Sequence, residues 1–211
     1  MKNSFFFENI IYWNHRFHIY IGLFLILFIL LFSFSGLLLN HGQWEFASFW
    51  KERKEVEIVT TLTIPANPDS TALLHNLMEQ LNLSGEIINV KRFPSGINFR
   101  VMKPGTIHDI QVDLTNGKCV RKELVYNWYG KIRTLHTFNG SNKMKPEVKP
   151  NWLLTKTWSS TMDAVAIGLI FLCISSWIMW FKIRRKYTYG WIILFIGFGT
   201  AVFFIFLLKM Y

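Results

Sequence analysis

The stretch IYIGLFLILFILLFSFSGLLL, at Ile19–Leu39, decides the fold of this chain, because its 21 residues include no charged side chain. At ~1.5 Å per residue, such a helix is long enough to cross a hydrocarbon layer ~30 Å thick. It is also too long for the apolar part of a secretory signal, so we expect an uncleaved anchor. Two more apolar runs occur at Ala164–Phe181 and Trp191–Leu208. The sequence therefore predicts three transmembrane helices, at residues 18–40, 158–181 and 191–209.

The charge of the loop between the last two helices predicts their orientation. Residues 182–190 contain two lysines and two arginines, and short basic loops stay on the cytoplasmic side. We therefore place this loop and the N-terminal segment 1–17 in the cytoplasm or at its membrane surface. The segment 41–157 and the C-terminus then lie on the outer side.

The outer segment 41–157 is predicted to be one small domain with a return loop. Leucine and methionine recur at helical spacing through Ser70–Leu83, directly after Asp69, a residue type that caps helices. Five stretches separated by turn residues are candidate strands: Glu57–Ile64, Ile87–Phe93, Ile97–Met102, Ile107–Leu114 and Cys119–Leu124. Asn116-Gly117 is a hairpin signal. The fold class is therefore an α+β membrane protein whose outer domain packs one helix on a small antiparallel sheet.

Charge and cysteine content exclude several classes of function. The outer segment has 16 Lys and Arg against 11 Asp and Glu. This excess of positive charge indicates either ordinary surface charge or attraction of an anionic partner. Its basic residues are not interleaved with aromatic ones as in nucleic-acid binders, so no nucleic-acid partner is expected. Cys119 and Cys173 are the only cysteines and form no CxxC or CxxCH motif. Hydrolase, P-loop and dinucleotide motifs are also absent from the sequence.

Four segments resemble the PepSY-associated transmembrane protein family. They are VDLTNGKCVRKE (Val112–Glu123), RFHIYIGLFLILFILLFSFSG (Arg16–Gly36), LHTFNG (Leu135–Gly140) and MDAVAIGLIFLCISSWIMWF (Met162–Phe181). The first resembles the PepSY module, and the others resemble the spans and the Leu-His segment of the family. The family usually has Ser-Gly where this chain has Ser175-Ser176. The resemblance implies a bacterial inner-membrane protein with a PepSY domain outside; some relatives are haem proteins that reduce ferric siderophores.

The small and polar residues of the first span fall on one side of a helix drawn at 100° per residue. They are His15, His18, Gly22, Ser33, Gly36 and Asn40, whereas Ser35 falls elsewhere. Helix packing through small residues explains such a stripe without a cofactor. Packing combined with a flat cofactor explains it equally well, so both interpretations stay open.

His41 and His136 are the histidine pair most easily brought to one depth, at the outer boundary of the membrane. A b-type haem needs two neutral imidazoles on opposite faces of its iron, so we predict these two as tentative iron ligands. His18 matches the Arg-x-His position of the family, but no second histidine lies at its level. Asp163 is predicted to orient a ligand histidine, to pair with Lys156 or Arg133, or to cap the start of the second span.

Two functions remain open on these grounds. The first is inner-membrane electron transfer, with haem b as the cofactor and a ferric chelate or siderophore as the substrate on the periplasmic side. The second is a non-enzymatic, membrane-anchored PepSY module that binds a protein partner in a larger envelope complex. The expected partners are the lipid bilayer and membrane-complex subunits or a siderophore-uptake system. Control of a protease is a weaker third, because it rests on the PepSY resemblance alone.

Overall fold

The computed structural model describes residues 2–48, 52–65, 69–140, 151–182 and 187–210. The chain divides into two units. The membrane unit comprises Met1–Ile26 and Val165–Tyr211, and the domain unit comprises Leu27–Ala164. The helices α1 (Lys2–Asn40) and α4 (Leu153–Lys182) pass from one unit into the other. Each unit is therefore described by itself.

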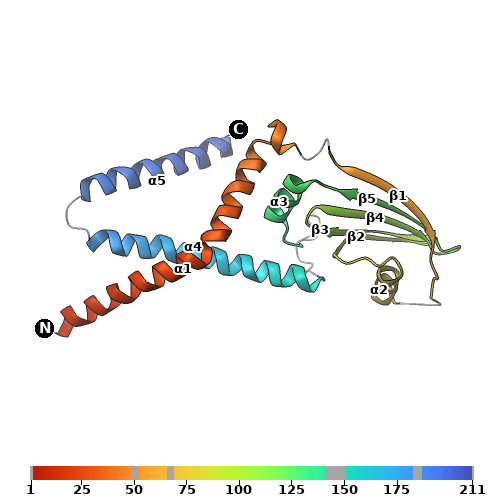
Figure 1. Cartoon of the computed structure of the whole chain (residues 1–211), viewed down its shortest axis with the longest axis horizontal. Coiled ribbons are helices and arrows are strands. Elements are labelled where there is room, and N and C mark those ends of the chain that lie inside the picture. The colour runs from red at the N-terminus through yellow and green to blue at the C-terminus, as the bar shows by residue number, and fades with distance from the viewer. Residues whose placement is uncertain (1, 49–51, 66–68, 141–150, 183–186, 211) are drawn as a thin grey trace. The chain divides into compact units, whose positions relative to one another are not determined.

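Three described helices, α1, α4 and α5 (Tyr187–Met210), are long and apolar enough to cross a membrane (Figure 1). The three predicted spans are thereby confirmed. Their bounds differ, because α1 runs without a break through the predicted segment 1–17 and α4 begins five residues before the predicted position 158. The predicted orientation rests largely on residues 183–186, which lie outside the described residues, so it stays a prediction.

The domain unit contains an antiparallel sheet of five strands in the order β1-β5-β4-β3-β2. The strands are β1 (Lys54–Thr61), β2 (Glu86–Phe93), β3 (Gly96–Lys103), β4 (Thr106–Asp113) and β5 (Lys118–Val125). The predicted α+β class and the Asn116-Gly117 hairpin are confirmed, and Gly117 has the positive φ of 73° that this turn requires. β1 begins three residues upstream of the predicted Glu57.

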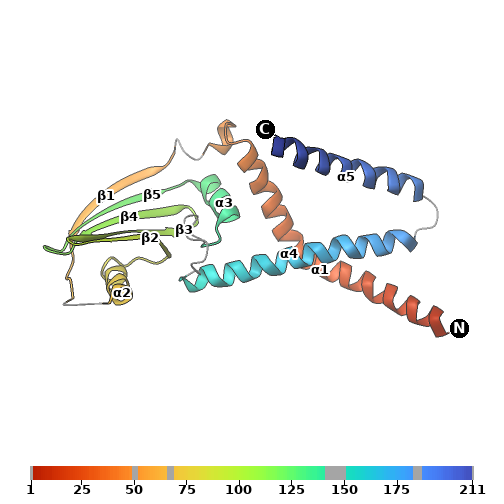
Figure 2. The same cartoon turned by 180° about the vertical axis from the view of Figure 1, so that it is seen from behind.

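One face of the sheet is covered by α2 (Ser70–Gln80), as both views show (Figures 1 and 2). Asp69 caps this helix, accepting a hydrogen bond from the backbone N–H of Ser70 at 2.8 Å. Leu73 and Leu77 of α2 are buried against alternate residues of β3 and β4, which include Phe99 and Ile110. Side chains alternate along a strand, so the intervening residues face the other side of the sheet.

Buried His108 on β4 predicts that acid weakens the fold of the domain. It is 4 % exposed, and its Nδ1 atom has no hydrogen-bond partner among the described residues. Burial lowers the pKa of His108 below its ordinary value of about 6.5. Glu123 opposes this effect, and Arg121 and Lys103 add smaller contributions in the same direction as burial. Below that ordinary value the unfolded chain binds more protons than the folded one, so stability is lost as the pH falls.

We therefore expect the thermal midpoint of the full-length protein in detergent to drop between pH 8 and pH 5, and to drop less in His108→Leu. The matched control is His75→Leu, because the His75 side chain is 77 % exposed on α2. An equal drop in the wild type, His108→Leu and His75→Leu would contradict the role given to His108. Scanning fluorimetry at both pH values makes the measurement.

Candidate functional site

His18 lies on α1 in the membrane unit and contacts α4. Its Nδ1 atom is 3.1 Å from the hydroxyl oxygen of Ser175, which is 1 % exposed. Asn14, one turn earlier on α1, donates its side-chain amide to the Ser175 carbonyl at 3.3 Å. No histidine partner is predicted for His18, and in the structure its partner is a serine of the second span.

His136 lies in the domain unit, on the short helix α3 (Trp128–Thr137), and contacts α1. Its Nδ1 atom is 2.6 Å from the hydroxyl of Ser35, and its ring meets Phe32 edge-on at 5.0 Å. The Ser35 hydroxyl donates to the Phe32 carbonyl at 3.1 Å. With its proton on the Phe32 carbonyl, the Ser35 hydroxyl accepts from Nδ1–H of His136, and the lone pair of the neutral imidazole is then on Nε2.

The two histidine contacts repeat one arrangement. In each, the Nδ1 atom of a histidine lies within hydrogen-bond distance of a serine that is 1 % exposed: His18 of α1 with Ser175 of α4, and His136 of α3 with Ser35 of α1. Apolar packing of Leu38 of α1 with Ile132 of α3 supports the second contact. These reciprocal hydrogen bonds fix the orientation of both rings.

His41 does not join His136. Its ring lies flat on Trp44, with a centroid distance of 3.9 Å and an interplanar angle of 2°. The His136 ring instead contacts Phe32 and Ser35, at least six residues before His41, or ~9 Å along a helix. In this arrangement the pair does not fit the two faces of one haem iron. Haem ligation by His41 and His136 stays a prediction that requires His41 to leave Trp44.

Asp163 is exposed on α4, and no hydrogen bond or ion pair of its side chain occurs within the described part of the chain. The capping interpretation is wrong, because α4 begins at Leu153 and Asp163 lies in its third turn. The predicted contacts with Lys156 and Arg133 are also not formed. A carboxylate is thus left without a partner inside an apolar span.

Apart from His18, which contacts α4, the predicted stripe of small and polar residues makes little packing contact within the described chain. Ser33 and Asn40 are exposed, and no atom lies within 4 Å of a side chain built at Gly22 or Gly36. Buried positions on α1 are Leu25, Ser35 and Leu38. Packing of this stripe against another chain stays a prediction.

Sequence reasoning missed the junction between the sheet and α4. Glu86 on β2 is 1 % exposed, and its carboxylate accepts the backbone N–H groups of Asn151 at 2.6 Å and Trp152 at 3.0 Å. The Asn151 side chain bonds to both the N–H and the carbonyl of Ile87, at 3.0 and 2.8 Å. Glu86 thus starts α4, and Asn151 closes the outer edge of β2. A glutamate directly before the apolar residues Ile87 and Ile88 was the available signal.

Sequence reasoning also missed α3 and the two serines, Ser35 and Ser175. A capping asparagine, Asn127, precedes α3 and accepts the Gly130 N–H at 3.0 Å. No group of three or more metal-ligating side chains occurs among the residues that the structure describes. The arrangement therefore offers oriented imidazoles and one unpartnered carboxylate, but no assembled metal centre.

Comparison with known proteins gives one match. Residues 12–210 match the model of a family described as PepSY_TM-like, which is nearly the whole chain. No curated protein and no solved structure matches.

Proposed function

This chain belongs to the PepSY_TM-like family and is a membrane protein with a PepSY-like domain, and from that premise we propose that it is a non-enzymatic accessory subunit. The spans anchor the chain in the bacterial inner membrane, with the N-terminus cytoplasmic. The PepSY-like domain and the C-terminus are periplasmic. The domain binds a protein partner within a larger envelope complex.

The exposed carboxylate of Asp163 carries this proposal. Insertion scales give a cost of about 3 kcal/mol for an aspartate at the centre of a membrane helix, and the cost falls toward the ends; Asp163 is in the first half of α4. Carboxylates inside a span normally face a polar partner. The described chain supplies none to Asp163. A donor from another subunit, such as a lysine, an arginine or a hydroxyl group, would satisfy it. The spans then form part of the binding surface together with the domain.

The anchoring of the domain supports the same function. Within the domain unit, Glu86 and Asn151 tie the sheet to the start of α4, and His136 ties α3 to α1 through Ser35. A partner bound to the sheet is therefore held at a set orientation to the two helices. An anchored module needs this rigidity, whereas a tethered receptor on a free linker does not.

Replacing Asp163 tests the proposal. We expect Asp163→Leu to lose the co-purifying subunit from native membranes, because leucine offers no hydrogen-bond acceptor, whereas Asp163→Asn retains part of it. The control Glu79→Leu removes a carboxylate that is 68 % exposed on α2 and should leave the complex intact. Equal recovery of the same subunit with Asp163→Leu and the wild type would exclude the role assigned to this carboxylate.

Haem-dependent electron transfer to a ferric chelate is the second candidate, and the His136 tautomer favours it. The Ser35 hydroxyl holds Nδ1, which leaves Nε2 as the free donor atom of a neutral ring, as in histidines that ligate metals. A bound haem would supply one-electron chemistry. The second axial ligand would come from His41 or from a partner chain, because the described residues do not form the pair.

An absorption spectrum of the protein purified in mild detergent tests this candidate. A Soret band that disappears in His136→Ala and persists in His75→Ala would support it. A colourless, iron-free preparation from cells supplied with haem would exclude it. That outcome leaves the accessory-subunit proposal untouched.

A further inference from the structure

The short helix α3 lies beside the apolar part of α1 within the domain unit (Figures 1 and 2). Ile132 of α3 packs on Leu38 of α1. One turn later, the ring of His136 contacts Phe32, which is six residues before Leu38, or ~9 Å along a helix. No Asp, Glu, Lys or Arg occurs from residue 17 to residue 44. The whole contact is therefore made with the uncharged stretch of the span, and α3 runs along it toward its middle.

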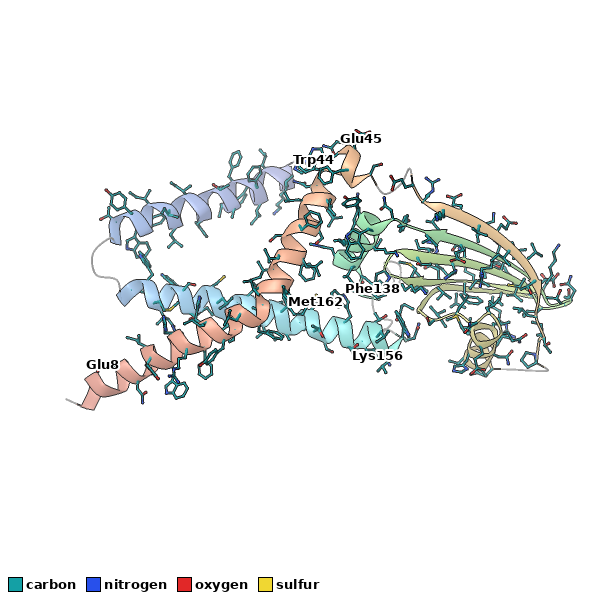
Figure 3. The ribbon with its side chains drawn as sticks, in the orientation of Figure 1. Glu8, Trp44, Glu45, Phe138, Lys156 and Met162 are labelled. Atoms are coloured by element: carbon teal, nitrogen blue, oxygen red, sulfur yellow. The ribbon has the colours of Figure 1, made fainter. Side chains whose placement is uncertain are left out.

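The first turns of α4 lie at the same level as the end of α3. The Trp158 ring is 6.4 Å from the Phe32 ring, and its indole N–H donates to the carbonyl of Phe138, directly after α3, at 3.0 Å. Figure 3 marks Phe138 between α3 and these turns of α4. Leu135 of α3 and Leu154 of α4 line one open, mostly apolar groove of about 340 Å³. The end of α3 and the start of α4 thus form one apolar surface beside α1.

Large apolar side chains at this level are exposed within the described chain. Phe34 and Leu37 of α1 are exposed, and so are Leu153 and Leu154 at the start of α4. Exposed apolar surface of this kind indicates contact with a membrane or a partner. Phe34 and Leu37 belong to a span, so lipid covers them. Lipid at that depth also reaches the two leucines of α4.

The polar groups of α3 are arranged as contact with lipid requires. The Thr134 hydroxyl donates to the carbonyl of Gly130 at 2.8 Å, and the Phe138 carbonyl accepts the indole of α4. Such groups must be paired inside the protein where no water is present. The Arg133 side chain extends away from the apolar stretch, since a Cβ atom built at Gly42 would lie 2.9 Å from its Nη1 atom. Basic side chains near the membrane boundary extend toward the headgroups in the same way.

From these contacts we propose that α3 is a membrane element. It dips into the leaflet on the side of the sheet, and lipid acyl chains cover its outward side and fill the groove between Leu135 and Leu154. Lipids are not selected by charge, because none of the described residues that line this groove is charged. The sequence predicts the whole segment 41–157 outside the bilayer, so α3 would be an exception within it. The inference is independent of the accessory-subunit proposal and of haem.

Spin-label accessibility in the full-length protein, reconstituted in dioleoyl phosphatidylcholine vesicles, tests the inference. The labels are attached to Leu135→Cys and Leu154→Cys in a Cys173→Ser background, in which the remaining Cys119 is buried. Oxygen dissolves in hydrocarbon, whereas a neutral nickel chelate stays in water. We therefore expect both labels to collide with oxygen several-fold more often than with the chelate. Leu154 is 58 % exposed, so its label reports the result even if Leu135→Cys does not fold.

Two reference labels set the scale for this measurement. Leu30→Cys is at an exposed position in the middle of the uncharged stretch of α1 and should report lipid. Lys118→Cys is at an exposed position of β5 and should report water. Chelate accessibility at Leu135 and Leu154 as high as at Lys118 would overturn the inference, because α3 would then lie in water. Low accessibility to both reagents would overturn it too, because protein rather than lipid would cover the groove.

Discussion

Replacing Glu86 with leucine is expected to reduce the free energy of unfolding of the domain unit by about 3 kcal/mol and its thermal midpoint by roughly 10 °C. The glutamate is 1 % exposed and accepts the N–H groups of Asn151 and Trp152. Leucine leaves both part-buried donors without an acceptor, and a buried donor left unpaired costs about 1–3 kcal/mol. The start of α4 then keeps only the bonds of the Asn151 side chain to Ile87 of β2.

Hydrogen–deuterium exchange locates this effect as well as measuring it. In Glu86→Leu the peptide spanning Asn151–Trp158 should exchange faster than in the wild type, before any change in α2. Glu86→Gln retains one acceptor oxygen and should fall between the two. Glu79→Leu, at an exposed site, should behave as the wild type. Unchanged exchange at Asn151–Trp158 in Glu86→Leu would show that the carboxylate does not start α4.

Replacing Gly168 with leucine should separate α1 from α4 in the membrane unit. A Cβ atom at Gly168 would lie 2.9 Å from a methyl carbon of Leu25 and 3.5 Å from one of Ile21. Overpacking of this kind costs about 1–3 kcal/mol. Lipid tails solvate leucine as well as a neighbouring helix does, so no apolar burial offsets the clash. The contact of His18 with Ser175 should then weaken.

Spin labels on α1 and α4 measure this separation. Leu23 and Ile170 are 63 % and 60 % exposed, so labels there disturb no packing within the described chain. Gly168→Leu should broaden the distance distribution and shift it to longer values. Gly197→Leu is the matched control, because nothing lies within 4 Å of a side chain built on that α5 glycine. A narrow, unshifted distribution in Gly168→Leu would mean that the two helices do not pack through this residue.

The sheet could be predicted from the sequence because its turns have specific chemistry. Asn116-Gly117 and the Pro-Gly turn before Thr106 fix where strands end, and Asp69 fixes where α2 begins. The short helix α3 was not predicted, because its ten residues include a glycine and two threonines, which are weak helix formers. Without α3, the depth of His136 was unknown, and the pairing with His41 had no geometric basis.

The packing face of α1 differs from most of the predicted stripe. Small and polar residues are typical of contacts between membrane helices, and His18 of the stripe does contact α4, but nothing in the described chain lies within 4 Å of a Cβ atom built at Gly22 or Gly36. The structure places contacts at His18, Leu25 and Phe32, which repeat every seven residues. Seven residues make two turns at 3.5 residues per turn, so these contacts lie along one face of α1. A search at 3.6 residues per turn drifts off this face.

For Asp163, unlike the packing face of α1, the sequence alone identifies the residue that matters. Its identity and its place in an apolar run mark it as a functional residue from sequence alone, and the structure adds that no described residue of the same chain satisfies it. Under the proposed function, the partner of Asp163 belongs to a second subunit. The sequence identifies the residue, and the structure adds that no described residue of the chain pairs with it.

The mass of the assembly released from native membranes tests the central claim most directly. Native mass spectrometry of the wild-type protein, extracted in mild detergent, should give one defined complex that contains this chain and at least one other polypeptide. The Asp163→Leu protein should give the chain alone, with or without bound lipid. A wild-type chain that is always released without a protein partner would contradict its function as an accessory subunit.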